Sequence, residues 1–257
     1  MAAGFFKSLL KSLTVALFWL AVWYIAAAAV DKELLLPSPV AVLKRLGELS
    51  LTADFYITTA FSVIRVVSGI ALATALGLIL SLITHVSRIA DALIKPLITV
   101  IKATPVASFI ILALVWISRD RLPIFIALLM VLPVVWTNLR EGLNRIDPKL
   151  IEMAKVFKST PWQTLKHIYM PSVLPYFTAS MRTSLGLDWK AGIAAEVLAL
   201  TKKAIGKQLF DSKSYLETTE LFAWTVAVII LSLIIELAFE AVVKSYQRKR
   251  RAQDAEN

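Results

Sequence analysis

The sequence predicts an all-α membrane protein with six transmembrane helices. Hydrophobic residues make up 58% of the 257-residue chain, and its mean hydropathy is +0.72. Soluble domains are only about half apolar. The apolar residues also gather in segments close to the roughly 20 residues that a helix needs to cross a bilayer. These segments lack the period-two alternation of membrane barrel strands, so they are predicted to be helices.

The predicted spans are 12–30, 58–83, 93–117, 122–139, 172–200 and 221–243. The first is expected to be retained, because its apolar run is too long for a cleaved signal peptide. A short interfacial helix is expected after Pro39. Pro96 and Pro105 interrupt the third span, and proline in a helix removes a hydrogen bond and kinks the chain. Such breaks either line a transport pathway or only adjust packing.

The net charge of +10 is attributed to the membrane rather than to nucleic acid, because no basic stripe with stacking aromatics is present. Lysine and arginine concentrate in the loops after even-numbered spans. Since basic loops stay on the cytoplasmic side, both termini are predicted to be cytoplasmic, with 244–257 as a basic cytoplasmic tail.

Residues for catalysis are missing from the sequence. It has no cysteine, which excludes thiolate chemistry. The stretch 201–208 lacks the first glycine and the final hydroxyl of a phosphate-binding loop. His85 and His167 are isolated, without the partner that a helical metal site needs. We therefore predict no catalytic residue, no metal and no cofactor bound by this chain, which is not expected to hydrolyse ATP itself.

Residues 147–171 form a polar island in this apolar chain, predicted to be two short helices. Asp147 is a suitable N-cap, with Pro148 at the first helical position. Leu150, Ala154 and Phe157 then share one face.

The second helix begins at a capping box, Thr160-Pro161-Trp162-Gln163, and Pro171 is expected to end it. Isolated helices of this length are marginal in water. They need a surface, either lipid headgroups or a groove in a soluble partner. The residues alone favour neither alternative.

The island resembles the cytoplasmic loop of permease subunits of binding-protein-dependent ABC importers. Their pattern is Glu-Ala-Ala, three residues, Gly, nine residues, then Ile-x-Leu-Pro. Here Glu152, Ala154, Ile168 and Pro171 match. Lys158 stands where the pattern has glycine, which would permit a left-handed turn. The lysine must either adopt that conformation or force a different turn.

Further segments resemble the nitrate, sulfonate and taurine branch of this family, so that the likeness covers about residues 12–245. These segments are 34–39 (LLLPSP), 62–69 (Ser62, Arg65, Val66 and Gly69), 138–148 and 185–196.

The resemblance implies a multi-pass subunit in a prokaryotic cell (inner) membrane, working with a second copy of itself. Two cytoplasmic ATPase subunits would use ATP and Mg, and an extracytoplasmic solute-binding protein would deliver a nitrate-, sulfonate- or taurine-like anion or a related small molecule. The residues expected to couple to the ATPase are Glu152, Ala154, Phe157, Lys158, Pro161 and Pro171.

Ionisable groups inside spans are costly and therefore functional candidates. The candidates for the substrate pathway are Lys102, Pro105, Asp188, Trp189, Lys190 and Glu196. A buried packing network is the alternative for this set. The alternative function is a stand-alone secondary carrier or channel. Such carriers often contain two inverted halves with matching broken helices, and no second copy of 147–171 is found. A scaffold that holds a soluble partner at the membrane is a third alternative, which the mid-span charges disfavour.

Overall fold

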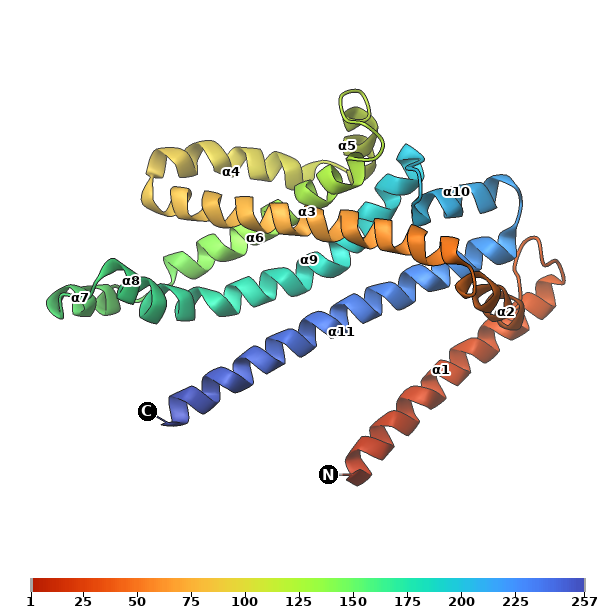
Figure 1. Ribbon diagram of the computed structural model, residues 1–257, viewed down its shortest axis with the longest axis horizontal. Coiled ribbons are helices and arrows are strands. Elements are labelled where there is room, and N and C mark those ends of the chain that lie inside the picture. The colour runs from red at the N-terminus through yellow and green to blue at the C-terminus, as the bar shows by residue number, and fades with distance from the viewer. Residues whose placement is uncertain (1, 257) are drawn as a thin grey trace.

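A computed structural model describes the backbone of residues 2–256 and the side chains of 13–246 and 248. Its regular structure within these residues is helical (Figure 1). In chain order the elements are α1 (Ala2–Val30), α2 (Pro39–Ser50), α3 (Ala53–Val86), α4 (Arg88–Ala103), α5 (Val106–Ala113), α6 (Leu122–Asn144), α7 (Pro148–Val156), α8 (Pro161–Thr164), the π-helix η1 (Leu165–Tyr169), α9 (Met170–Ala199), α10 (Ile205–Ser214) and α11 (Thr218–Glu256).

Among the described residues, α1, α3, α6 and α11 are each long and apolar enough to cross a membrane. They match the first, second, fourth and sixth predicted spans. α9 matches the fifth in position, but it carries four charged side chains, Arg182, Asp188, Lys190 and Glu196. The segment 244–257, expected to be a tail, continues α11 as far as Glu256.

The third predicted span is not one helix. α4 and α5 meet at an angle of 102°, so that together they form at most a broken span. Thr104 is extended (φ −83°, ψ 130°), because the residue before a proline disfavours the helical region. Pro105 therefore makes the break. The interruption expected in this span is therefore confirmed at Pro105, whereas Pro96 lies inside α4 without ending it.

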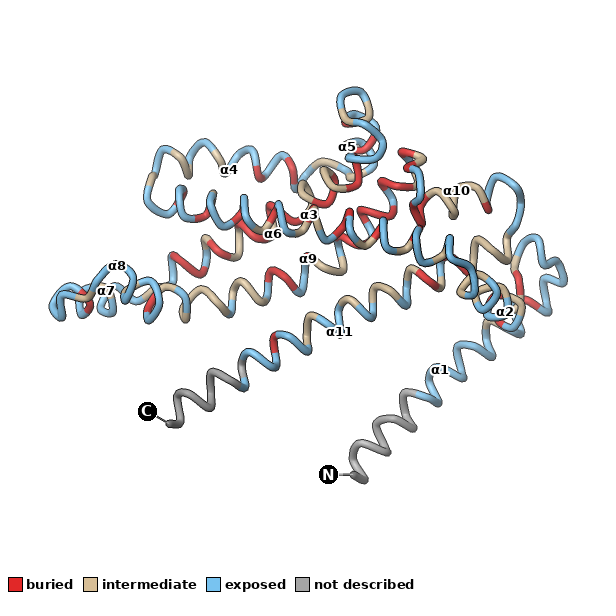
Figure 2. The backbone as a smooth tube through the Cα atoms, viewed as in Figure 1, coloured by how far each residue is buried: buried red, intermediate tan, exposed pale blue. Residues whose placement is uncertain are grey.

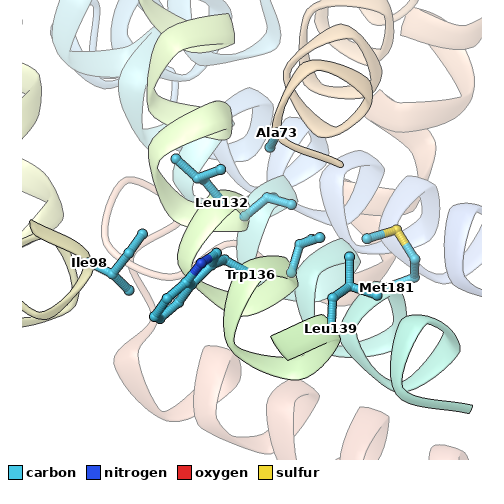
Figure 3. Close-up of a cluster of buried hydrophobic side chains, with 8 residues drawn as sticks. Ala73, Ile98, Leu132, Trp136, Leu139 and Met181 are labelled. Carbon is cyan, nitrogen blue, oxygen red and sulfur yellow. The ribbon is translucent and has the colours of Figure 1, made fainter. Parts of the chain in front are cut away.

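The core lies around α6, which packs between α3 and α9. Figure 2 shows the buried residues concentrated on these three helices. Gly69 lets α3 approach α6 closely, since a Cβ atom there would lie 2.2 Å from Ala127 Cβ. In one buried cluster, Leu139 of α6 lies beside Met181 of α9, and Trp136 of α6 lies toward Ile98 of α4 (Figure 3).

The peripheral helices are α1 and α11, which diverge from the bundle toward the two chain ends (Figure 1). Most side chains of 13–30 are exposed, as a lipid-facing helix requires. The expected helix after Pro39 is confirmed as α2. Ser38 caps it, Val42 is fully buried, and Arg45 Nε donates to Glu220 of α11 at 3.1 Å.

Candidate functional site

The polar island begins with α7, as its caps predict. The Asp147 side chain accepts a hydrogen bond from the Lys149 N–H at 2.9 Å, and Pro148 follows at the first helical position. The expected apolar face is only partly buried. Ala154 is 6% exposed, whereas Leu150 is 38% and Phe157 76% exposed. Phe157 therefore lacks a packing surface within the described part of this chain.

The turn after α7 is left-handed at Lys158, whose φ is +51°. The Ser159 N–H donates to the Ala154 carbonyl at 2.9 Å, and the Lys158 N–H donates to the Lys155 carbonyl at 3.0 Å. These two bonds define a Schellman motif, in which the residue at the position of Lys158 is usually glycine. The left-handed turn therefore forms with lysine in the glycine position.

Because a side chain in this conformation costs roughly 1–2 kcal/mol, Lys158→Gly is expected to stabilise the protein by about 0.5–1 kcal/mol, after the entropic cost of glycine is subtracted. Lys155→Gly, three residues earlier on helical backbone, is the matched control and should destabilise by about the same amount. Thermal unfolding followed by tryptophan fluorescence measures both. Equal effects of the two glycines would contradict the left-handed turn.

α8 begins at the predicted capping box. The Gln163 N–H donates to Thr160 Oγ1 at 3.2 Å, and the Thr160 N–H donates to Gln163 Oε1 at 2.8 Å. Pro161 occupies the first helical position. This part of the sequence prediction is confirmed.

The expectation that Pro171 ends the second helix was wrong, because the chain continues through η1 into α9. The Met170 N–H donates to the Leu165 carbonyl, five residues back. A proline ring clashes with the carbonyl four residues earlier in a regular helix. A π-turn widens the backbone just before Pro171, and such turns often occur at functional sites. The island is thus joined to the long helix α9 without a break in helical structure.

An exposed apolar surface covers this end of the molecule, where α7 and α8 lie beyond the bundle (Figure 1). We call it the loop patch. Figure 2 shows α7 and α8 as mainly exposed. Its members are Met153 (48% exposed), Val156 (78%), Phe157 (76%) and Trp162 (69%). The sequence placed Trp162 in the capping box but did not reveal that these four apolar residues of the loop would all be exposed.

Near the patch, Glu152 lines a cavity of about 360 Å³, which also touches His85 of α3 and Asn144 of α6. His85 Nδ1 and Asn144 Oδ1 lie 3.4 Å apart. The loop therefore meets the ends of the bundle helices at Glu152, while the residues of the loop patch are exposed.

A buried polar network lies toward the opposite end of α9. Ser62 Oγ donates to Glu196 Oε2 at 2.8 Å, and Arg65 Nη1 lies 3.3 Å from Glu196 Oε1. The same carboxylate accepts from the Gly206 N–H at 3.2 Å, while the Ile205 N–H donates to Ser62 Oγ. Glu196 is fully buried. The network joins α3, α9 and the start of α10.

Arg65 also holds the loop between α9 and α10. Its guanidinium donates to the Lys202 carbonyl at 2.9 Å and to the Lys203 carbonyl at 3.1 Å. Thr201 Oγ1 donates to the Arg119 carbonyl at 3.0 Å. The stretch 201–208 does not match a phosphate-binding loop in sequence. In the structure, three hydrogen bonds hold its first residues in place, two from Arg65 and one from Thr201.

The structure divides the pathway candidates into two groups. Lys102, Pro105 and Lys190 are exposed, and Lys102 Nζ donates to Thr137 Oγ1 of α6 at 2.8 Å. The buried candidates are Asp188, Trp189 and Glu196.

The buried members of this set differ in their partners. The Trp189 indole N–H donates to the Val228 carbonyl at 3.0 Å. Neither carboxylate oxygen of Asp188 has a hydrogen-bond partner among the described residues. The sequence identified all six pathway candidates but did not show which of them would be exposed.

These features define an integral membrane protein built of long apolar helices, with an exposed, capped loop at one end. The chain belongs to the family described as binding-protein-dependent transport system inner membrane component, which matches residues 73–252. It is the membrane-spanning subunit of an ABC importer.

The relatives support this membership. The chain is 25% identical over 249 residues to a Bacillus subtilis (strain 168) protein named for aliphatic sulfonates transport, the permease protein SsuC, covering 96% of this chain and 87% of that protein. It is 29% identical to the SsuC protein of Escherichia coli (strain K12), covering 85% and 82%. It is also 24% identical to the taurine transport system permease protein TauC of Escherichia coli (strain K12), covering 86% and 82%.

Solved structures share the fold. The chain aligns with an amino acid ABC transporter structure at a TM-score of 0.57 and 15% identity, covering 73% of this chain and 90% of that one. It aligns with the inward-facing MetNI methionine ABC transporter at a TM-score of 0.56 and 17% identity, covering 74% and 93%.

Proposed function

We propose that two copies of this chain form the pathway for a small anionic solute, and that the loop patch docks on a partner ATPase. The observation that carries this proposal is the patch itself. Phe157 and Trp162 are aromatic, largely exposed and held by a capped loop. A buried aromatic anchor in a pocket is the usual centre of a protein interface. The side chains of the patch are exposed, so a soluble partner can reach them.

The π-turn and α9 would carry movement from that interface into the membrane. α9 packs along α6 and reaches the Glu196 network near its other end. When two ATPase subunits close on ATP and Mg, the loops of the two copies would move with them. The pathway would then shift between inward- and outward-facing states, because ATP favours one of them.

In the proposed six-span arrangement, α4 and α5 together form one broken span and α9 forms a further, continuous span. The loop and both termini would then lie on the cytoplasmic side of the inner membrane. That side carries the excess of basic residues. A solute-binding protein would then meet the α2 and α10 end.

The solute class is inferred from the relatives, whose names refer to aliphatic sulfonates and taurine. All of these are small molecules with an acidic group. The exposed lysines Lys102 and Lys190 suit an anion in a pathway between two copies, because an ammonium group attracts it at close range.

The test is co-expression of the chain with an ATPase of the same importer class, followed by purification and reconstitution in vesicles. We expect the two to purify together and to take up the solute only with ATP and its binding protein. Uptake by the chain alone would support a stand-alone carrier instead and would overturn the proposal.

A further inference from the structure

An apolar groove lies between α3, α6 and the start of α9, with a volume of about 310 Å³. Leu139 and Leu143 form its floor, at 2% and 4% exposed, while Leu82 and Met170 form its rim at 43% and 60%. Its lining is apolar except for Ser81 and Tyr169. The Ser81 hydroxyl is already bonded to the Leu78 carbonyl at 2.8 Å. The groove therefore offers a hydrocarbon surface to its occupant.

In the orientation given under the proposed function, the α3 part of the groove lies at the depth of the inner-leaflet lipid tails. Its α3 residues, 78–82, belong to the last turns of the predicted span 58–83, just before α3 ends at Val86. Its volume is at the lower end of the range for pockets that hold organic ligands, roughly 300–1,000 Å³. Contact between water and an apolar surface is unfavourable. An acyl chain of a lipid is itself apolar and lies at the same depth in the membrane.

Two basic residues lie in the chain between the groove residues Leu165 and Tyr169. Lys166 is exposed, and it directly follows the groove residue Leu165 in η1. His167 is exposed next to it. Basic residues beside openings between transmembrane helices on the cytoplasmic side bind anionic lipid headgroups.

We propose that this groove binds an acyl chain of an anionic phospholipid, whose headgroup lies at Lys166. The placement in the inner leaflet rests on the orientation given under the proposed function. The occupant would contact Leu165, Tyr169 and Met170, which belong to or adjoin the π-turn between the loop patch and α9. A bound lipid would therefore support the segment through which the loop moves the membrane helices.

The test is native mass spectrometry of the full-length chain, released from membranes that contain equal amounts of phosphatidylglycerol and phosphatidylcholine. Wild type is expected to retain phosphatidylglycerol under conditions that strip other lipids. Val173→Trp fills the groove from α9 and should lose that lipid. Leu237→Trp is the matched control, since Leu237 is 69% exposed on α11 and does not line the groove. It should retain the lipid as wild type does.

Lys166→Gln should keep a lipid in the groove but lower the preference for phosphatidylglycerol about five-fold, which is the effect of removing one basic group at an anionic membrane surface. If Val173→Trp fails to fold, Leu82→Trp at the rim repeats the test. Equal lipid retention in wild type and the groove-filling variant would overturn the proposal. Loss of a dimer of the chain in the groove-filling variant, with lipid retention unchanged, would also overturn it. In that case the groove would hold a second copy of the chain. Neither measurement needs an ATPase or uptake, so failure here is distinct from failure of the proposed function.

Discussion

Arg65→Ala is expected to lower the free energy of unfolding by about 3–5 kcal/mol, the cost of removing one partner from a buried ion pair. Glu196 is fully buried and would keep its carboxylate with no counter-ion. The carbonyls of Lys202 and Lys203 would also lose their donor. For a chain of this size the unfolding midpoint should fall by about 10 °C.

The measurement is thermal unfolding of the purified chain in detergent, followed by tryptophan fluorescence. This probe suits the chain because it has seven tryptophans and no cysteine for thiol dyes. The matched control is Arg145→Ala, which breaks a surface pair with Glu141, where the side chains are 67% and 49% exposed. Such pairs contribute at most about 1 kcal/mol.

A double variant keeps this prediction testable if Arg65→Ala does not fold. Arg65→Met with Glu196→Gln removes both charges, and replacing a whole buried pair is often close to neutral. It should recover most of the lost stability. If Arg65→Ala and Arg145→Ala unfold at the same temperature, the network does not hold α3, α9 and α10 together.

Phe157→Asp is expected to weaken binding of the partner ATPase about thirty-fold or more, which corresponds to the loss of an interface anchor of 2 kcal/mol. ATP-dependent uptake should fall with it. The fold should persist, because Phe157 is 76% exposed and a charge there meets water rather than a core.

The matched control is Tyr215→Asp, since Tyr215 is also aromatic and 75% exposed but lies between α10 and α11, away from the loop. Co-purification with the ATPase measures binding, and the unfolding midpoint checks the fold. Unchanged ATPase recovery with Phe157→Asp would show that the loop patch is not the docking surface.

The caps of the island were predictable because each depends on residues within a few positions of one another. Asp147 bonds to Lys149, and Thr160 bonds to Gln163. The family pattern likewise identified Lys158 as the critical turn residue. It could not decide whether the lysine would adopt a left-handed conformation, since that choice depends on how α7 and α8 are held.

The effect of each proline on its helix could not be predicted from the neighbouring residues alone. Pro96, Pro105 and Pro171 all lie in or beside predicted helices, yet only Pro105 breaks the chain sharply. Pro171 is accommodated because the preceding π-turn gives its ring room. Sequence alone shows that a hydrogen bond is lost, but not how the neighbouring turns compensate.

By itself, the sequence determined the helical membrane class, most helix positions and the importer family, because hydropathy, capping and short motifs are local properties. Only the tertiary structure decided which charges are buried. Glu196 and Arg65 are 131 positions apart and meet because α3 packs beside α9. Lys102 and Lys190 lie in apolar segments of the sequence, as the buried pathway candidates do, yet they remain exposed. Burial and pairing depend on how helices pack, and that information lies in contacts between distant segments.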